Sequence, residues 1–506
     1  MPNSFFQIFA LPVSALLAFL PGRVFGQGLL SEGFETDPLL SGWTRSGSGA
    51  SWSGTESASG THALSAETDG WSSPLLDTEP LRWYRLSFKS KAPGMVTNIG
   101  SAGYAFWSAV FYDENGTALN DDQYSSVFPS PDWVANEFRI RAKQRTGPGG
   151  TLLPVRLKVS FHPIGAQPLF IDDVILESTT ADEVAAWADA VYETLPAQLD
   201  YVPKASRWQR IPHTMEKLRT GQKLRIVLLG DSIQADTANA PIDALLQRAY
   251  PGSRVELISS TKGGSGVSYF KSHVAEYVTD YLPDLLMIGG ISHADDMTEF
   301  QSVADQVRAH DLANARNTEI MLLTKAWSSN NNFGNYYLSP GLRELDQDPA
   351  QNTSIPDDFR GHLLMFAHAN ELEYLDMTGI EAEFIYGPAA AAGVGAPTNA
   401  NGDPYSYWMR EWVHLNDRGK QILGREFEIF FAPPPSLAIS KSDAGEIILS
   451  WPGNATGYSL QSTDALSPIP VWNPASQNAE LLDGRRRVNV ALSPPIKQKF
   501  FRLTKP

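Results

Sequence analysis

Apolar positions in the middle of this 506-residue chain follow two spacings that alternate along the sequence. Continuous apolar runs of strand length are separated by segments in which apolar residues recur every three or four positions. The strand-like runs are 224–229, 254–259, 285–288, 319–324 and 373–377, and the helix-like segments are 241–249, 268–282, 297–310 and 359–370. This alternation predicts βαβ units, and therefore a parallel sheet with helices packed on it.

In the two terminal regions of the chain, apolar and polar positions alternate with a period of two residues instead. Residues 28–178 are rich in Ser, Gly, Thr and aromatic residues, and the runs 83–89 and 155–161 alternate apolar with polar positions. This pattern predicts an antiparallel β-sandwich. Short strand-like runs also occur within 436–506, which predicts a small C-terminal β-domain.

Two linkers divide these regions. A helical segment at 181–195 follows the sandwich, and three consecutive prolines at 433–435 form a stiff spacer before the last domain. We therefore expect a multidomain protein in which an α/β domain at 181–432 lies between a β-sandwich and a small β-domain.

Residues 1–26 contain an apolar stretch and end in small residues near Gly26. This composition is typical of a secretory signal peptide, although no basic residue stands next to Met1. A retained membrane anchor is the alternative, and Pro12, Pro21 and the short length argue against a membrane span. We expect the mature protein to be exported, to the periplasm or the exterior, and soluble.

Composition narrows the partners that the protein can have. The chain has no cysteine, so an exported form must rely on its buried core rather than on disulfides. Its formal net charge is −16, and an acidic surface disfavours nucleic acid and anionic membranes as partners.

Candidate chemistry begins where the first apolar run stops, at Gly230-Asp231-Ser232. A serine at the carboxyl end of a buried strand and near a helix N-terminus has backbone N–H groups around it. These groups can face a negative charge that develops beside the serine oxygen. The alternative is a turn in which Asp231 and Ser232 only cap the next helix.

A second candidate lies near the end of the α/β region, where Glu411 precedes His414 by three residues. In a turn, that carboxylate can accept the imidazole Nδ1–H, which leaves Nε2 to take a proton from a serine hydroxyl. Ser232, Glu411 and His414 would then form an activated nucleophile. The alternative is that His414 caps a helix or packs in the core.

Together, the Gly-Asp-Ser block and the Glu-x-x-His block resemble the SGNH (GDSL-type) hydrolase family over roughly 181–432. The resemblance implies a flavodoxin-like three-layer α/β/α fold and hydrolysis of esters, often on carbohydrates or lipids. Ser232 matches the nucleophile and His414 the base. Glu411 stands where the family usually has Asp, which requires a slightly different backbone position.

The resemblance also implies two oxyanion donors. In the loop 262–266, the backbone N–H of Gly266 is the best match and that of Gly264 the second, unless this is an ordinary flexible loop. His293 stands where the family has Asn, and an imidazole can donate an N–H, although His293 could be unrelated to the hole. Because Ser232, Gly266 and His293 each follow a different strand, we expect them at one edge of the sheet.

The sandwich region resembles jelly-roll carbohydrate-binding modules in its opening 33–35 with Trp43 and its closing 169–174. Such a module binds glycan or serves only as a spacer. The resemblance implies a structural Ca²⁺ held by Asp172 or Asp173 together with Glu32 or Glu35. Catalysis by the predicted triad requires neither a metal nor an organic cofactor.

These features predict an exported serine esterase that removes acetyl or other acyl groups from polysaccharide or oligosaccharide. Two alternatives remain open. A relative of the same fold would be an O-acyltransferase that moves an acyl group onto a glycan. A chain whose catalytic domain had decayed would be a glycan-binding protein without activity.

Overall fold

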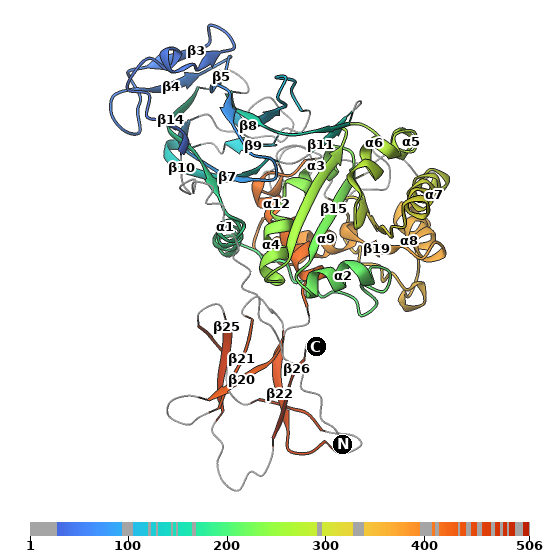
Figure 1. Ribbon diagram of the computed structural model, residues 1–506. Coiled ribbons are helices and arrows are strands. Elements are labelled where there is room, and N and C mark those ends of the chain that lie inside the picture. The colour runs from blue at the N-terminus through green and yellow to red at the C-terminus, as the bar shows by residue number, and fades with distance from the viewer. Residues whose placement is uncertain are drawn as a thin grey trace, which may run out of the picture.

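The computed structural model forms three units along the chain (Figure 1). The predicted leader at 1–26 lies outside the described residues. The described residues are 28–93, 105–119, 123–127, 130–142, 145–147, 150–163, 168–290, 296–326, 338–394, 407–409, 414–433, 436–441, 447–452, 458–466, 471–475, 479–482, 485–490 and 499–504.

The middle unit contains a five-stranded sheet in which every pair of neighbours is parallel. Its strands are β15 (Lys223–Gly230), β16 (Arg254–Thr261), β17 (Leu285–Ile288), β18 (Glu319–Leu323) and β19 (Glu373–Leu375). They lie in the order β16-β15-β17-β18-β19. The five predicted strands are confirmed. Doubly wound sheets adopt this strand order, in which the chain first adds a strand on one side of β15 and then adds the others on its opposite side.

Helices cover both faces of this sheet, because alternate strand residues point to opposite sides. Ile226 and Leu228 belong to one buried cluster, and Val227 and Leu229 to another. The first cluster includes α2 (Pro212–Arg219), α3 (Ser232–Asn239), α4 (Ile242–Ala249), α9 (Met377–Tyr386) and α12 (Asp417–Phe431). The second includes α5 (Val267–Phe270), α6 (Val274–Tyr277), α7 (Met297–Asn314) and α8 (Phe359–Ala369). Further short helices among the described residues of this unit are η2 (Thr279–Tyr281), η4 (Pro349–Gln351) and α10 (Pro388–Ala391).

The helices of the middle unit differ from the prediction at two places. The single helix expected at 268–282 is divided into α5, α6 and η2. The backbone leaves helical geometry at His273 and Val278, and the aromatic rings of Tyr269, Phe270 and Tyr277 pack against one another around the break. The helix expected at 241–249 is present as α4, but it is preceded by a separate helix, α3, that the pattern did not predict. Pro241, which has no N–H to donate, separates α3 from α4.

The N-terminal unit is built from two antiparallel sheets, as the period of two predicts. One has the order β10-β7-β14-β4-β3 with β1 beside β14, and the other has the order β2-β5-β13-β8-β9 with β6 beside β13. Buried residues of both sheets, such as Leu86, Phe88 and Phe161, form its core. The elements are β1 (Gly28–Glu32), η1 (Pro38–Ser41), β2 (Thr44–Arg45), β3 (Ala50–Ser53), β4 (Ala63–Ala66), β5 (Trp71–Ser72), β6 (Leu76–Asp77), β7 (Trp83–Ala92), β8 (Ala105–Tyr112), β9 (Gln123–Val127), β10 (Ser130–Arg141), the hairpin β11 (Arg145–Gly147) and β12 (Gly150–Leu152), β13 (Arg156–His162) and β14 (Leu169–Thr179).

A buried joint connects this sandwich to the middle unit. The linker helix α1 (Ala181–Glu193) packs on α4, and Trp83 lies in the same apolar cluster. Arg141, at the end of β10, forms an ion pair of 2.7 Å with Asp243 of α4 and donates a hydrogen bond of 2.8 Å to the carbonyl of Ala238 in α3. The sandwich therefore contacts the helix that begins at Ser232.

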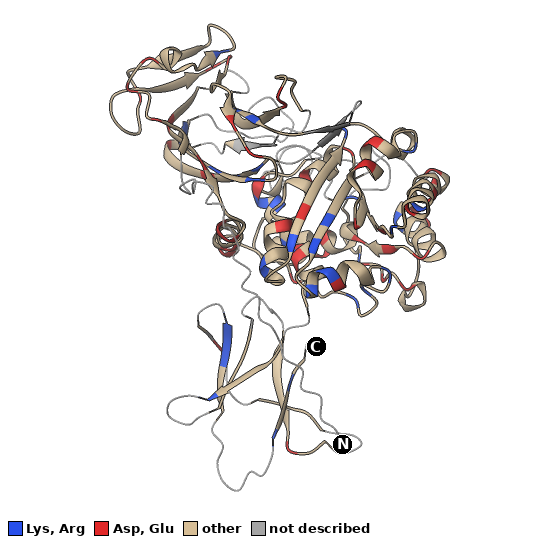
Figure 2. Cartoon of the chain, viewed as in Figure 1, with Lys and Arg blue, Asp and Glu red and all other residues tan. Residues whose placement is uncertain are grey.

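The C-terminal unit consists of two small antiparallel sheets around a core that includes Leu449, Trp451 and Val488. Its strands are β20 (Ala438–Lys441), β21 (Ile447–Pro452), β22 (Ser459–Thr463), β23 (Asn473–Pro474), β24 (Glu480–Leu482), β25 (Arg485–Val490) and β26 (Phe500–Thr504). Figure 2 shows basic residues on β25, while both signs of charge are distributed over the middle unit. Within the described residues, no helix has the length and apolar character that crossing a membrane requires.

Candidate active site

Ser232 lies where the buried strand β15 ends. A Cβ on Gly230 would overlap the carbonyl oxygen of Gly289, so the strand needs glycine there. Asp231 is the N-cap of α3, and its carboxylate accepts a hydrogen bond of 2.9 Å from the N–H of Ile233. Ser232 is the first helical residue and is half-buried, which leaves its side chain partly accessible at the carboxyl edge of the sheet.

The loop after β16 lies against this serine. The N–H of Lys262 donates to the carbonyl of Gly230 at 2.9 Å, and a Cβ on Gly263 would be 3.9 Å from the Cβ of Ser232. Gly266, the predicted oxyanion donor, lies at the N-terminus of α5, three residues further along. Gly263 is therefore a residue beside Ser232 that sequence spacing did not select, although the run of glycines pointed to the loop.

The loop after β17 reaches the same turn from the other side. The N–H of Gly289 donates to the carbonyl of Leu229 at 3.0 Å. Gly290 has a positive φ of 66°, and a Cβ there would be 2.5 Å from the nitrogen of Gln234 and 2.8 Å from a carboxylate oxygen of Asp231. His293, three residues later, lies outside the described residues, so its role stays a prediction.

The turn that carries His414 is attached to α3. The N–H of Leu415 donates a hydrogen bond of 3.0 Å to the Oδ2 of Asp236. Asp236 and Ser232 are four residues apart in α3, so they lie on one face of that helix. The Nε2 atom of His414 is buried. His414 directly precedes Leu415, which this hydrogen bond joins to α3.

Asn416 fixes the far side of that turn. Its N–H donates to the carbonyl of Trp408 at 3.1 Å, and its side chain accepts from Arg418 and Gly419 as the N-cap of α12. Asn416, two residues after His414, thus caps the N-terminus of α12. Glu411 lies outside the described residues, and its contact with His414 stays a prediction.

Two charged residues of the site were not predicted. Asp236 is 4% exposed, and the Nζ of Lys420 is 4.0 Å from its second carboxylate oxygen. Lys325, two residues after the end of β18, is 3% exposed. Burial lowers the pKa of Lys325 to about 8, whereas the negative charge of Asp231 raises it. The available sequence signal was a charged residue immediately after an apolar run.

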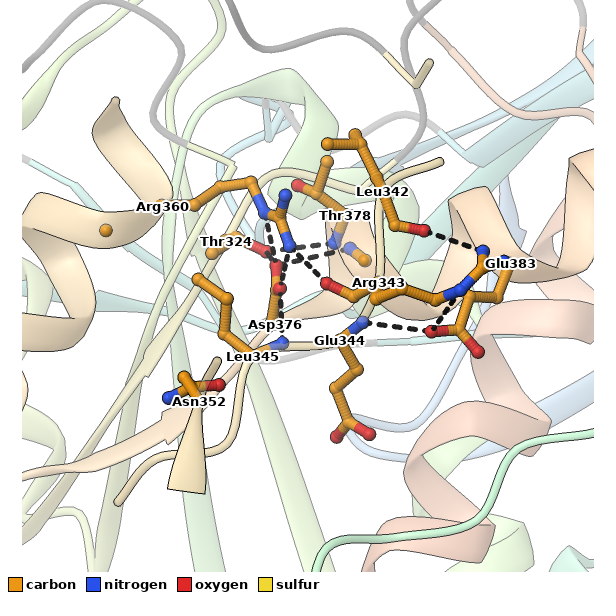
Figure 3. Close-up of polar contacts among 12 residues, drawn as sticks. Thr324, Leu342, Arg343, Glu344, Leu345, Asn352, Arg360, Asp376, Thr378 and Glu383 are labelled. Carbon is orange, nitrogen blue, oxygen red and sulfur yellow. Dashed lines mark hydrogen bonds and ion pairs between the residues drawn. The ribbon is translucent and has the colours of Figure 1, made fainter. Parts of the chain in front are cut away.

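The backbone around Lys325 is held by a network at the ends of β18 and β19 (Figure 3). The hydroxyl of Thr378 donates to the carbonyl of Lys325 at 2.7 Å, and the N–H of Thr378 donates to the hydroxyl of Thr324 at 2.9 Å. Thr324 in turn donates to Asp376 at 3.0 Å, and Arg360 binds the same carboxylate. This network fixes the position from which the Lys325 side chain extends.

Asp172 and Glu35, two of the carboxylates predicted to hold calcium, accept hydrogen bonds from backbone N–H groups of the loop 58–61 in the sandwich. Asp172 accepts from the N–H groups of Ala58 and Ser59 at 2.8 and 3.0 Å, and Glu35 accepts from the N–H of Thr61 at 2.9 Å. Across the described part of the chain, no three His, Cys, Asp or Glu side chains are arranged to hold a metal ion. Calcium binding by Asp172 or Asp173 with Glu32 or Glu35 stays a prediction.

No protein-family model and no curated protein matches this sequence. Among solved structures, the chain is similar to a two-domain esterase active on acetylated mannans, with 13% identity, coverage of 59% of this chain and 91% of that chain, and a TM-score of 0.31. It is also similar to the CBM22-1 xylan-binding domain from Paenibacillus barcinonensis Xyn10C, with 17% identity, coverage of 31% and 97%, and a TM-score of 0.23. Likenesses at this level do not assign an activity.

Proposed function

We propose that this protein is a carboxylic ester hydrolase of the SGNH type, with Ser232 as nucleophile and His414 as base. The observation that carries the proposal is the hydrogen bond between Leu415 and Asp236. It attaches the histidine turn to the face of α3 that begins with Ser232. Acyl transfer needs a serine hydroxyl within reach of a histidine base, and this hydrogen bond supports such a juxtaposition.

In the proposed reaction, the hydroxyl oxygen of Ser232 attacks the ester carbonyl carbon while its proton passes to His414. The tetrahedral intermediate then releases the alcohol, which takes that proton from His414, and an acyl-serine remains. Water then attacks the acyl-serine while its proton passes to His414. The bond between the acyl carbon and the Ser232 oxygen breaks, His414 returns the proton to that oxygen, and the carboxylic acid leaves. Glu411 is proposed to accept the Nδ1–H of His414 and so to hold the reactive tautomer.

Charge on the carbonyl oxygen requires donors at the same edge of the sheet. The N–H of Ser232, at the start of α3, is one proposed donor. Gly266 and His293 remain the proposed second and third donors. The position of Gly263 beside Ser232 makes the backbone of its loop a further source of N–H groups.

The proposed substrate is an acylated polysaccharide or oligosaccharide outside the cytoplasm. The buried joint between the sandwich and α3 supports a unit in which a glycan-binding module and the nucleophile have a fixed relation. Acetylated mannan, named for the similar two-domain esterase, is therefore the first polymer to test, with acetylated xylan next. An O-acyltransferase of the same fold is the second candidate.

The test measures free acetate from these polymers, without any added acceptor, for the wild type, Ser232→Ala and His414→Ala. We expect release by the wild type and a loss of roughly 10³-fold or more in both variants, since the nucleophile and its base act as a unit. Ser302→Ala on α7 is the matched control and should keep wild-type activity. Full activity in Ser232→Ala would contradict the assignment, and acetyl transfer only to an added glycan would favour the acyltransferase.

A further inference from the structure

A groove of about 410 Å³ lies on one sheet of the sandwich and shares no residue with the proposed active site. It crosses β1, β14, β7 and β10, which are neighbours in that sheet. Its volume is in the range of cavities that bind small ligands. The groove is therefore a second place at which this chain can hold a ligand.

A row of side chains in register crosses the groove from strand to strand. Ser31 of β1 is paired with Ile175 of β14, which is paired with Ser87 of β7. Glu137 of β10 is paired with Ser87 and ends the row. Residues in register on neighbouring strands point to the same face of a sheet. An extended ligand that followed this row would therefore lie across the strands.

Longer charged side chains border the row on one side. Lys89, two positions after Ser87, forms an ion pair of 2.9 Å with Asp173. Asp173 has a φ of 51°, which is unusual for a residue other than glycine, at a bulge in the pairing of β14 with β7. Because the bulge changes the direction of successive side chains, Asp172 is buried while Asp173 lines the groove.

The other side of the row adjoins the linker helix. Arg139, two positions after Glu137 on β10, lies on the same face of the sheet and donates a hydrogen bond of 2.8 Å to Glu137. The guanidinium of Arg139 also lies over the ring of Trp187 in α1, 5.1 Å from its centroid. Since α1 packs on α4, the groove is on the face of the sandwich that the middle unit reaches through this helix.

The lining restricts the chemistry of the ligand. Its described residues include three carboxylates, those of Glu32, Glu137 and Asp173, and one ammonium, that of Lys89. This balance disfavours a polyanion, whereas carboxylates and serine hydroxyls can bind the hydroxyl groups of an uncharged sugar. Phe88, the aromatic residue of the described lining, is 2% exposed, so its ring offers no platform on which a sugar could stack.

We infer that this groove binds an uncharged glycan chain in its acylated form. The choice of ligand rests on the proposed function, because such a glycan is the proposed substrate. A row of short side chains leaves room for substituents on the sugar, and Ile175 and Ala135 offer apolar surface to acyl methyl groups. Each methyl group buried in this way should tighten binding roughly fourfold.

The experiment measures the binding of acetylated mannan, and of the same polymer after chemical deacetylation, by titration calorimetry. The full chain carries Ser232→Ala, which prevents the proposed hydrolysis during the measurement. We expect the acetylated polymer to bind at least about fourfold more tightly than the deacetylated one.

Two further changes in this background locate the binding. Ser87→Arg fills the middle of the row and should weaken binding by about 10-fold or more through steric exclusion. Glu137→Gln removes one carboxylate without adding volume and should weaken binding severalfold, which keeps the test valid if the arginine disturbs the sheet. Ser51→Arg, at an exposed position of β3 in the same sheet, is the matched control and should leave binding unchanged.

The outcomes separate the groove from the active site. Unchanged binding in both Ser87→Arg and Glu137→Gln, or equal binding of the two polymers, would overturn this inference and leave the proposed function intact. With Ser232 present, Ser87→Arg should hydrolyse p-nitrophenyl acetate at the wild-type rate and show a higher KM for acetylated mannan. Selective binding in the groove without acetate release by the wild type would overturn the proposed function and support the groove as a glycan site.

Discussion

The backbone N–H of Leu415 donates a hydrogen bond of 3.0 Å to a carboxylate oxygen of Asp236. Both residues are buried, and they belong to elements far apart in the sequence. Since Leu415 follows His414 and Asp236 lies one helical turn after Ser232, this bond is the described link between the proposed base and the proposed nucleophile. A carboxylate outside the predicted triad thus joins the two elements that carry the proposed base and the proposed nucleophile.

Asp236→Ala should therefore lower kcat by roughly 10- to 100-fold with little change in KM, because small misplacements of a catalytic group are costly. Asp236→Asn keeps an oxygen that can accept from Leu415 and should retain most of the activity. Steady-state kinetics on an acetyl ester measure both values. Wild-type kcat in Asp236→Ala would show that this link does not position His414.

Gly290→Ala should damage both folding and activity. Its φ is 66°, and the added Cβ would meet the nitrogen of Gln234 at 2.5 Å and Asp231 at 2.8 Å. Gly341→Ala is the matched control, because its φ is also positive but no atom lies within 4 Å of the added Cβ. We expect Gly341→Ala to lower stability by only about 1 kcal/mol and to keep kcat. Equal losses of stability and kcat in the two variants would mean that backbone strain, and not the close approach to Asp231, causes the damage.

Arg141→Met should weaken the joint between the sandwich and the middle unit. It would leave Asp243 buried without its ion pair of 2.7 Å and remove the donor to Ala238 in α3, a type of change that costs about 3–5 kcal/mol. Arg85→Met removes a partly exposed ion pair with Glu177 on the same sandwich and should cost at most about 1 kcal/mol. Scanning calorimetry compares the two variants. Similar melting temperatures would indicate that the joint contributes little.

Glu344 predicts a loss of stability at alkaline pH. Burial raises its pKa to about 8, and the charge of Asp376 also raises it, while Lys204 lowers it. The folded state therefore holds a proton that the unfolded state releases near the ordinary value of about 4.5, so this contribution is complete below pH 4.5 and is lost as pH rises toward 8. In Figure 3 the side chain of Glu344 extends away from the Asp376 network, and its backbone N–H donates to Glu383.

Glu344→Gln removes the titrating group but keeps an amide that can accept from Tyr201, whose hydroxyl lies 3.1 Å away. The melting temperature of Glu344→Gln should fall less between pH 5 and 9 than that of the wild type. In the wild type, a protonated buried carboxyl group changes the free energy of unfolding by up to about 1.4 kcal/mol per pH unit. Melting curves in a pH series test this. Identical pH dependence in the variant would contradict a protonated Glu344.

The sheet of the middle unit could be predicted because its strands are buried on both faces and therefore read as continuous apolar runs. The turn at Gly230-Asp231-Ser232 could be predicted for the same reason, since a polar block ends such a run. The start of α3 could not. Its residues Gln234, Asp236 and Thr237 are polar yet buried, so the helix has no apolar stripe that its sequence would show.

The rest of the site escaped prediction because burial of charge depends on tertiary contacts. Nothing local distinguishes Asp236 from a solvated surface residue, and the position of Lys325 after an apolar run does not by itself show that its side chain is buried. Gly263 was within the predicted loop, but spacing cannot tell which of several glycines faces the serine. The predicted roles of Glu411, Gly266 and His293 stay predictions.

Covalent labelling with a fluorophosphonate, followed by peptide mapping, tests the nucleophile most directly. One adduct is predicted, on the hydroxyl of Ser232, with no adduct in Ser232→Ala and a much slower reaction in His414→Ala. An adduct on a different serine, or an unmodified wild-type protein under conditions that label a known serine esterase, would contradict a nucleophile at Ser232.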